Sequence, residues 1–394
     1  MALQSAVGFS ENIDESYEAG LEIGDVVLEK IDLRAHSVGI LFCHIDFDFA
    51  ELLRGIEEKL DIPIIGCTTS GEANDQGFFE ESASLMVLTA DDVEFGLGIG
   101  QNLSKDSEKA VQMAYESAKA VLGDDKPKLA LTFPDKVLSL AGEHILSLLE
   151  QRLDKGVPVV GGLAGDNLQL KKTYQFLNHE VYSDAIPLLL LSGNIEPLVI
   201  TRSGWIPMGK RAKATKVQGN VLLEIDHQPA IEYLKKYNPD VDDPLVMASY
   251  PIALLDESLG DEAGRYFVVR GSFQYNKENG AVFYQGDIPE NATIQLARGS
   301  REDILAGSAD AITTLMEKSA GRELHTLLCF SCAGRKLMLG LDTKKEIELI
   351  LNDLPANCAV NGFYTDGEIG PIDSSVEHLK KNRFHNTTLV LCGF

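Results

Sequence analysis

The sequence is poor in basic residues. It has 35 Lys and Arg against 60 Asp and Glu, which gives the 394 residues a net charge of −25 at pH 7. Nucleic acids and anionic membrane surfaces attract proteins through clusters of Lys and Arg. We therefore expect neither a nucleic acid nor a membrane surface as a partner of this chain.

Long apolar runs are also lacking. The longest uncharged runs, Pro244–Leu255 and Leu354–Thr365, have 12 residues each, whereas a membrane-spanning helix needs about 20 apolar residues. The first residues, MALQSAVGFSENIDE, show neither the basic nor the apolar region of a signal peptide. Six cysteines are too few for a disulfide scaffold. These features predict a cytoplasmic chain without membrane insertion, whose thiols are reduced and buried.

Motifs for metal binding and nucleophilic catalysis are absent. The eight histidines form no HxxxH or HExxH pair, so no metal site is expected, and Cys329 and Cys332 have no second pair of ligands nearby. Because Cys329 ends an apolar strand-like run, we expect this cysteine pair to be buried and structural. No GxSxG or SxxK motif occurs. Cys67 and Ser70, in a glycine-rich turn, remain possible nucleophiles, but the sequence offers no base for them.

A unit of about 40 residues occurs three times. Each copy has an apolar strand, an amphipathic helix, a second apolar strand and a glycine-rich turn that ends near an acid. Strands that are apolar throughout are typical of βαβ units, in which both faces of the sheet are covered. Gly96, Gly98 and Gly100 alternate within another strand-like run and predict close packing against a neighbouring backbone. The three copies are residues 37–72, 128–166 and 325–368.

The predicted fold class is α/β with mixed sheets (a mixed α+β arrangement), built from repeated β-α-β units in two associated domains. Further strand-like runs follow each turn, and we expect residues 83–89 and 93–99 to pair as a hairpin. A different pattern fills the middle of the chain, with a plausible boundary near residues 216–219. The predicted organisation is an N-terminal extension at 1–36, a first domain at 37–216 and a second domain at 217–394.

The glycine-rich turns are the main candidates for a ligand site. Glycines after a buried strand let backbone N–H groups approach a ligand, and strand ends are the usual binding positions in α/β sheets. The same residues also suit plain turn and capping chemistry, and the sequence leaves both interpretations open. The second turn has only its acid, whereas the other two are rich in polar side chains. These candidates are Cys67, Thr69, Ser70 and Glu72 in the first turn and Tyr364, Asp366 and Glu368 in the third.

Three residues outside the turns are also candidates. Ser331 and Arg335 follow the first strand of the third unit, and His385 precedes the last strand. The guanidinium of Arg335 suits bidentate binding of a ligand carboxylate. A structural ion pair with one of the many acids is an equally good interpretation of Arg335. His385 is expected to line the same pocket as the turns.

Together these segments resemble the FIST family, whose sensory module has an N-terminal and a C-terminal region. The likeness covers residues 38–394, nearly the whole chain. It rests on segments that stand in the family's order: Ile65–Glu72, Val160–Asp166, Val221–Ala230, Gly299–Arg301, Phe330–Arg335, Gly362–Ile369 and His385–Thr388.

The resemblance implies a ligand-binding sensor of signal transduction rather than an enzyme. It implies a small polar ligand, with amino acids as the usual suggestion, and no cofactor. Family members are often fused to output domains. In this chain about 36 residues precede the family-like region and none follow it, so we expect no room for an output domain. We therefore expect a separate signalling partner, such as a histidine kinase or a chemoreceptor.

Two alternative functions remain at this point. Stand-alone members of the family include haem-based nitric-oxide sensors that regulate a partner kinase, which would need one histidine as a haem ligand. A hydrolase or transferase that uses Cys67 or Ser70 is the third hypothesis. For the leading hypothesis, the predicted ligand-binding residues are Cys67, Thr69, Ser70, Glu72, Ser331, Arg335, Tyr364, Asp366, Glu368 and His385.

Overall fold

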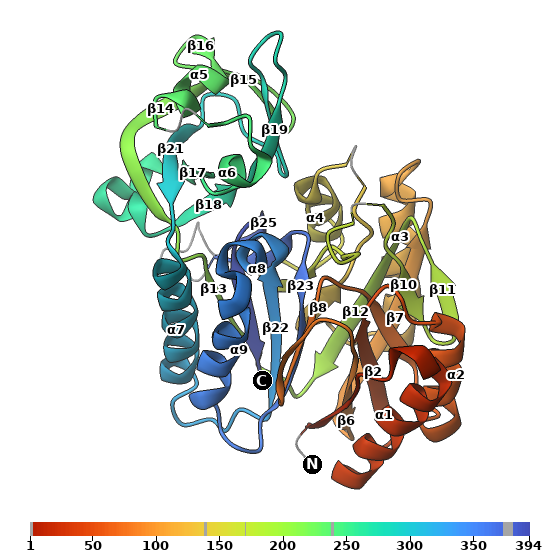
Figure 1. The fold of residues 1–394 in the computed structure, drawn as a ribbon. Helices are drawn as coiled ribbons and strands as arrows, with labels where there is room; N and C mark the ends of the chain where they lie inside the picture. The colour runs from red at the N-terminus through yellow and green to blue at the C-terminus, as the bar shows by residue number, and fades with distance from the viewer. Residues whose placement is uncertain (1–2, 138–139, 170, 238–239, 373–380) are drawn as a thin grey trace.

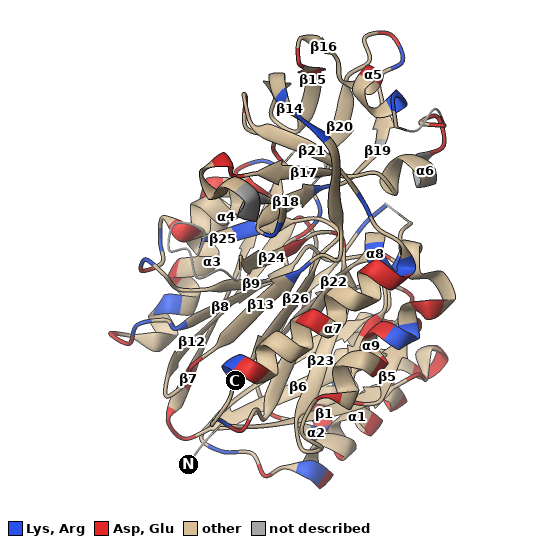
Figure 2. Ribbon diagram, turned by 90° about the vertical axis from the view of Figure 1, so that its left-hand side faces the viewer, with Lys and Arg blue, Asp and Glu red and all other residues tan. Residues whose placement is uncertain are grey.

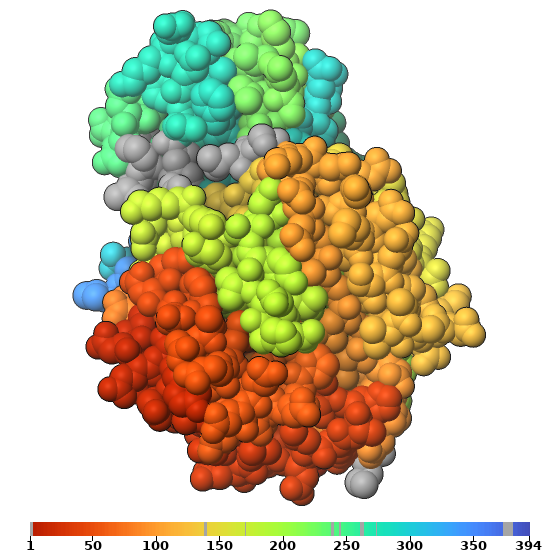
Figure 3. Space-filling model, turned by 90° about the vertical axis from the view of Figure 1, so that its right-hand side faces the viewer, coloured from red at the N-terminus to blue at the C-terminus, as the bar shows by residue number. Residues whose placement is uncertain are grey.

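The molecule consists of a body of three six-stranded sheets and a module that lies at one end of it (Figure 1). The structure is a computed structural model, and it describes residues 3–137, 140–169, 171–237, 240–372 and 381–394. In the space-filling view the module is a separate lobe above the body (Figure 3). Each sheet of the body contains one parallel pair of strands among antiparallel neighbours. The predicted α/β class with mixed sheets is confirmed.

The body is built from three units with the same order of elements. The first unit contains β1 (Gln4–Ser10), α1 (Ser16–Lys30), β2 (His36–Cys43), α2 (Phe49–Lys59), β3 (Ile64–Thr68), β4 (Glu72–Asn74), β5 (Gly77–Phe79) and β6 (Ala83–Ala90). The second contains β7 (Val93–Gln101), α3 (Ser107–Leu122), β8 (Leu129–Thr132), α4 (Gly142–Glu150), β9 (Val159–Gly162), β10 (Gln175–Leu177), β11 (Glu180–Tyr182) and β12 (Ala185–Gly193).

The third unit is interrupted by the module. It contains β13 (Leu198–Arg202), α7 (Arg301–Lys318), β22 (Thr326–Cys332), α8 (Ala333–Leu339), α9 (Thr343–Asn352), β23 (Ala359–Thr365), β24 (Glu368–Pro371), β25 (Asn382–His385) and β26 (Leu389–Gly393). The module, residues 206–298, contains β14 (Ile206–Gln218), β15 (Val221–Ile225), β16 (Gln228–Pro229), α5 (Ala230–Lys235), α6 (Pro244–Ala248), β17 (Ile252–Leu255), β18 (Phe267–Arg270), β19 (Ser272–Tyr275), β20 (Val282–Tyr284) and β21 (Thr293–Arg298).

The three units exchange their short hairpins. The hairpin of β4 and β5 from the first unit pairs with β23 in the sheet of the third unit. The hairpin of β24 and β25 pairs with β9 in the sheet of the second unit. The hairpin of β10 and β11 pairs with β3 in the sheet of the first unit. No unit therefore completes its own sheet. The first unit's sheet needs a hairpin from the second unit, the second unit's sheet needs one from the third, and the third unit's sheet needs one from the first.

Local sequence explains where the main helices begin and end. The side chain of Asp106 accepts a hydrogen bond from the backbone of Lys109 at the start of α3, and Gly123 ends this helix at φ 57°. Ser300 and Asp303 form a capping box at the start of α7. The helical spacing of apolar residues in 107–122 and 301–318 predicts both helices with these same bounds. Within the described ranges, no helix is long and apolar enough to cross a membrane.

Glycines bring backbones into direct contact at two kinds of position. A Cβ atom at Gly96, Gly98 or Gly100 would lie within about 2 Å of a carbonyl oxygen of α3, which confirms the predicted close packing. The first glycine of each repeated turn packs against the neighbouring strand: a Cβ at Gly66 or Gly362 would lie 1.8 Å from a carbonyl oxygen. These turn glycines are therefore required for strand packing.

Equivalent phenylalanines meet at the centre of the body. Phe42, Phe133 and Phe330 each lie at or beside the end of the first parallel strand of their unit. The ring centroids are 5.1 Å apart for Phe42 and Phe133, 6.2 Å for Phe42 and Phe330, and 6.0 Å for Phe133 and Phe330. All three are fully buried, and Phe363 packs against them. This shared core joins the three sheets.

One detail of the sequence interpretation changes in the structure. The prediction that residues 83–89 and 93–99 form a hairpin is wrong, because β6 and β7 belong to different sheets. The chain leaves one sheet and starts the next at this point. Residue 216 lies inside β14, and β1, within the predicted extension, pairs with β6. The sheets thus group the chain into a three-unit body and an inserted module.

We expect Gly66→Ala to lower the free energy of unfolding by about 1–3 kcal/mol, because the new methyl group would overlap the carbonyl oxygen of Leu41. Gly264→Ala is a matched control, since its Cβ would meet nothing within 4 Å. Urea unfolding followed by circular dichroism measures both. Equal stabilities of the two variants would contradict this account of the turn glycines.

Candidate functional site

The three glycine-rich turns converge at one end of the body. The backbone N–H of Ser70 donates to the carbonyl oxygen of Tyr364 at 3.1 Å, and the N–H of Tyr364 donates to Gly71 at 2.8 Å. The second turn joins them through Gly165, which donates to Thr68, and Leu163, which donates to Gly367, both at 2.9 Å. The turns therefore bind one another, and their backbone groups at these positions are not open to a ligand.

Glu72 and Glu368 hold equivalent positions in the first and third turns. Glu72 accepts hydrogen bonds from the hydroxyls of Thr69 and Ser82, the latter at 2.7 Å. Glu368 accepts from Thr365 at 3.1 Å and from the hydroxyl of Thr388 at 2.7 Å. Burial raises the pKa of Glu72 to about 8 and that of Glu368 to about 7. Through these hydrogen bonds each carboxyl group links its turn to the segment before the last strand of its unit.

Arg335, Ser331 and Tyr364 form one buried network around Glu346. The guanidinium of Arg335 contacts the Glu346 carboxylate at 2.5 Å, and both side chains are completely buried. The hydroxyls of Tyr364 and Ser331 donate to the other carboxylate oxygen at 2.6 and 2.8 Å. Burial alone would raise the pKa of Glu346, but Arg335 and these donors hold it below its ordinary value.

The other contacts of Arg335 bear on its two sequence interpretations. Arg335 also donates to Ser308 and to the backbone oxygens of Ser203 and Ile304. Its donors are thus used within the protein, and no part of the side chain reaches solvent. The contacts favour the structural ion pair over a carboxylate-binding role. The hydroxyls of Ser331 and Tyr364 are likewise taken up by Glu346.

Two lysines lie over the converged turns. Lys136 forms an ion pair with Asp366 at 2.8 Å, which opposes the rise in the pKa of this acid that burial causes. Lys336 donates to the carbonyl oxygen of Ser70 at 3.0 Å and pairs with Glu80 at 3.2 Å. Both lysines are therefore engaged by the turns. The hydroxyl of Ser70 is buried and has no hydrogen-bond partner among the described residues.

The cysteines offer no reactive thiol. Cys67 lies in the central apolar core, and burial raises its pKa well above the ordinary value. Cys329 and Cys332 are buried too, with pKa values that burial raises in the same direction, as expected for a structural pair. A thiolate is the nucleophilic form of cysteine, and burial disfavours this form at these three sites. The described residues contain no group of three His, Cys, Asp or Glu side chains that could hold a metal ion.

A cavity of about 220 Å³ lies where the body meets the module. It is lined by the connection from β13 to β14, the start of β18, α7 and the turn between β25 and β26. We call it the junction cavity. Its side chains include three aromatic rings, two guanidiniums, a hydroxyl and a buried imidazole: Trp205, Tyr266, Phe267, Arg202, Arg265, Thr388 and His385. Among the predicted site residues, only His385 lines this cavity.

His385 is anchored at the cavity by the backbone of β24. Its Nε2 lies 2.9 Å from the carbonyl oxygen of Gly370, whereas its Nδ1 is buried and has no partner among the described residues. Burial lowers the pKa of His385 to about 3. Thr388, also in the cavity wall, donates to Glu368, so the cavity connects with the third turn.

The sequence did not indicate Trp205, Tyr266 and Arg265 as site residues. They lie on the connection into the module and at the start of β18, outside the repeated units. The indole N–H of Trp205 donates to the carbonyl oxygen of Thr387 at 3.2 Å, which fixes the connection against the body. One signal was available: Trp205 is the sole tryptophan of the chain.

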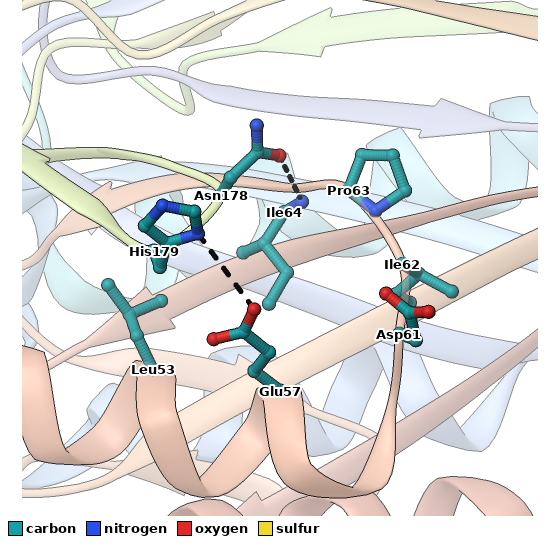
Figure 4. Close-up of a pocket in the computed structure, with 8 residues that line it drawn as sticks. All are labelled: Leu53, Glu57, Asp61, Ile62, Pro63, Ile64, Asn178 and His179. Carbon is teal, nitrogen blue, oxygen red and sulfur yellow. Dashed lines mark hydrogen bonds and ion pairs between the residues drawn. The ribbon is translucent and has the colours of Figure 1, made fainter.

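Another groove lies far from the turns (Figure 4). It has a volume of about 280 Å³ between the end of α2 and the turn from β10 to β11. Ile64, the first residue of β3, lies in its wall, so the groove is at the opposite end of this strand from the turns. In Figure 4 His179 faces Glu57 across it, at 3.9 Å. We do not assign a ligand to this exposed, acidic groove.

The three histidine-lined cavities of the described residues are too small for haem. They are lined by His179, His325 and His385 and have volumes of about 280, 210 and 220 Å³. Sites for drug-sized ligands, which are smaller than haem, usually have roughly 300–1,000 Å³. We therefore assign no haem ligand.

The sequence matches the FIST N domain over residues 37–228 and the FIST C domain over residues 230–371. The chain belongs to the FIST family. FIST domains are sensory domains of signal transduction, which agrees with the family that the sequence motifs indicate. The FIST C match spans most of the module and much of the third unit; of the residues that line the junction cavity, it includes 264–267, Gly307 and Asp310.

Relatives match a large part of the chain at low sequence identity. An uncharacterised protein of Methanocaldococcus jannaschii is 22% identical over 347 residues, 83% of this chain and 66% of the relative. An uncharacterised protein of Mycobacterium tuberculosis is 27% identical over 251 residues, 61% of each. The chain spans two thirds or less of these relatives. The PurLQS structure from Thermotoga maritima covers 99% of this chain and 72% of its own at 11% identity, with a TM-score of 0.23, too low to indicate a shared fold.

We expect Arg335→Met to lower the free energy of unfolding by about 3–5 kcal/mol, because it leaves the Glu346 carboxylate buried and unpaired. The double variant Arg335→Met with Glu346→Leu should regain much of this loss, since both charges are gone. Arg54→Met, at an exposed pair on α2, is the control and should change stability by less than about 0.5 kcal/mol. An equally small effect of Arg335→Met would refute the structural role.

The raised pKa values of Glu72 and Glu368 predict that the free energy of unfolding falls as the pH rises. In the folded protein they keep their protons up to pH about 8 and about 7, whereas unfolded glutamates lose them near pH 4.3. The folded state binds more protons in this window, so the free energy of unfolding declines through it. Relative to Glu72→Gln, the wild-type protein should lose up to about 1.4 kcal/mol per pH unit between pH 5 and 8.

Glu368→Gln provides the internal comparison for this pH dependence. Its difference from the wild-type protein should level off near pH 7 rather than near pH 8. Urea unfolding at pH 5 to 9 gives both curves. Parallel curves for the wild-type protein and both variants would show that the two carboxyl groups titrate normally.

Proposed function

We propose that the chain is a sensor that binds a small polar molecule in the junction cavity and signals through a separate partner protein. The observation that carries this proposal is the buried imidazole of His385, whose Nδ1 has no hydrogen-bond partner among the described residues. Buried polar groups are almost always paired, by protein, water or ligand. An unpaired group in a cavity wall is therefore a natural contact for a ligand.

The position of the cavity supports a sensory role. It lies where the chain leaves the body and enters the module, so an occupant contacts both parts. Module and body are joined at the junction by the hydrogen bond of Trp205 to Thr387 and by Arg270 of β18, which pairs with Glu143 of α4 and donates to the carbonyl oxygen of Phe384. A ligand that binds one arrangement of body and module better than another shifts the population toward it. That shift is the signal available to a partner.

A partner protein would detect this change at the outer surface of the chain. The body presents acidic residues across its visible helices, with Lys and Arg lying singly or in small groups among them (Figure 2). This charge distribution disfavours a nucleic acid and supports a protein as the partner. A histidine kinase or a chemoreceptor is the partner class that we propose.

Trp205 provides a direct test of ligand binding. It is the single tryptophan of the chain and is 4% exposed in the cavity wall. A bound molecule that changes the surroundings of the indole should produce a saturable change in its emission. We expect this in a titration with small metabolites, beginning with amino acids, and we expect His385→Ala to weaken the response at least tenfold.

His179→Ala is the matched control for this titration, because His179 lies in the distant groove of Figure 4. Its response should equal that of the wild-type protein. Native mass spectrometry identifies any molecule that copurifies with the chain. A molecule that binds the wild-type protein and His385→Ala equally, without a change in Trp205 emission, would place the site elsewhere and refute the proposal.

A further inference from the structure

A large groove lies where the sheet of the second unit meets the sheet of the third. Its volume is about 1460 Å³. One wall is formed by the connections before β8 and β9 and by the ends of β24 and β25, and the other by β13 and the end of α7. Figure 2 shows β8, β9 and β13 on this side of the body. We call it the lysine groove.

Polar side chains bridge the corresponding boundaries between the other sheets. Where the first sheet meets the second, Nδ1 of His36 on β2 lies 2.9 Å from the carboxylate of Glu94 on β7. Where the first sheet meets the third, the hydroxyl of Thr326 on β22 donates to that of Ser5 on β1 at 2.8 Å. The boundary between the second and third sheets contains the lysine groove, which therefore interrupts an otherwise repeated arrangement.

The charge of the groove is opposite to that of the chain. Acids outnumber bases 60 to 35 in the sequence, whereas four of the residues lining the groove are lysines and two are acids: Lys128, Lys155, Lys318, Lys381, Glu150 and Asp154. Both acids are engaged, since Asn382 donates to Glu150 at 3.1 Å and Lys126 pairs with Asp154 at 3.2 Å.

Three of these lysines are available to an occupant. Lys128, Lys155 and Lys381 are exposed, and their ammonium groups have no ion-pair partner among the residues that the structure describes. Ammonium groups that are not compensated within the protein attract carboxylates of a partner. The groove is thus a local positive site on an acidic molecule.

The walls between the lysines are apolar and rigid. Four of the 14 prolines of the chain line the groove, together with aliphatic side chains: Pro127, Pro158, Pro197, Pro371, Leu153, Val157 and Val199. The proline ring fixes φ, so these walls lose little conformational freedom when an occupant binds. Apolar walls of this kind suit the aliphatic side chains of a peptide.

The strands beside the groove favour an extended occupant. β13 and β25 are the edge strands of their sheets, so each has a strand neighbour on one side only among the described residues. Edge strands are the elements with which extended peptides pair. The volume of about 1460 Å³ also exceeds the roughly 300–1,000 Å³ of sites for small molecules.

A nucleic acid fits the groove less well than a peptide does. It carries a phosphate charge at every nucleotide, and the net charge of −25 on the chain would repel the part outside the groove. A peptide carries its acids only where they meet the lysines.

We infer that the lysine groove docks an extended acidic segment of the signalling partner, with its carboxylates on Lys128, Lys155 and Lys381 and its aliphatic side chains between the prolines. This inference rests on the proposed function for the existence of a partner, and adds the chemistry and the place of docking. Ile372 lines both the lysine groove and the junction cavity, so the docked segment lies next to the proposed ligand site.

Selection of random peptides displayed on phage against the full-length protein tests the inference. We expect enriched peptides in which Asp or Glu alternates with Val, Leu or Ile. A labelled synthetic copy, followed by fluorescence anisotropy, should bind the triple variant K128E/K155E/K381E at least about tenfold more weakly than the wild-type protein. Added NaCl should also weaken its binding to the wild-type protein, because salt screens exposed charges.

The triple variant K105E/K109E/K344E is the matched control. It changes three exposed lysines outside the groove and has the same net charge, so it should bind the peptide as the wild-type protein does. Carbodiimide coupling needs no variant, since it joins carboxylates to the lysine amines that they touch. Mass spectrometry of the coupled wild-type complex should find the peptide on Lys128, Lys155 or Lys381.

The outcomes separate the docking site from the function on which it rests. Enriched peptides without acids, no enrichment, equal binding by both triple variants, or coupling only to other lysines overturns the docking site. Single-stranded DNA that displaces the peptide at a lower concentration than the unlabelled peptide overturns a protein segment as the occupant. In each case a saturable change in Trp205 emission with a small molecule still supports the sensor. Peptide docking without any such change supports the groove and counts against the ligand site.

Discussion

The exchange of hairpins among the three units is the constraint on which the rest of the structure depends. Each sheet is completed by a hairpin from another unit, through the pairs β4 with β23, β10 with β3 and β24 with β9. The same exchange brings the three glycine-rich turns together, because each turn leads from its own sheet into the next. Phe42, Phe133 and Phe330 meet at the centre of this arrangement.

The polar residues of the turns are largely used to hold this arrangement. Glu72 and Glu368 each fasten a turn to a following strand, and Arg335 with Glu346 ties α8 and α9 to β22 and β23. Buried polar groups are stable only when they are paired, so a site made of them has little capacity left for a ligand. Unpaired buried polar atoms of the described residues include the Ser70 hydroxyl in the first turn and Nδ1 of His385 at the junction cavity, where the module is inserted into the third unit.

The sequence predicted local structure well and long-range pairing poorly. The three repeated units, the bounds of α3 and α7 and the packing role of Gly96, Gly98 and Gly100 follow from spacing and were predictable. The hairpin of β6 with β7 was wrong because strand partners come from other units. Arg335 stayed ambiguous because its partner, Glu346, is one of 60 acids. Trp205 and Arg265 belong to no repeat, so only the folded chain brings them to His385.

Native-state hydrogen exchange tests the central claim, that the three-unit body opens as one unit and that the junction opens separately from it. Amides of β3, β9 and β23 lie in three different sheets that complete one another. We predict that they exchange through one shared opening, with the same free energy and the same dependence on urea. Amides at residues 203–205 and 264–267 should open at a lower free energy. Separate opening energies for the three strands, or a junction as protected as the body, would contradict the account.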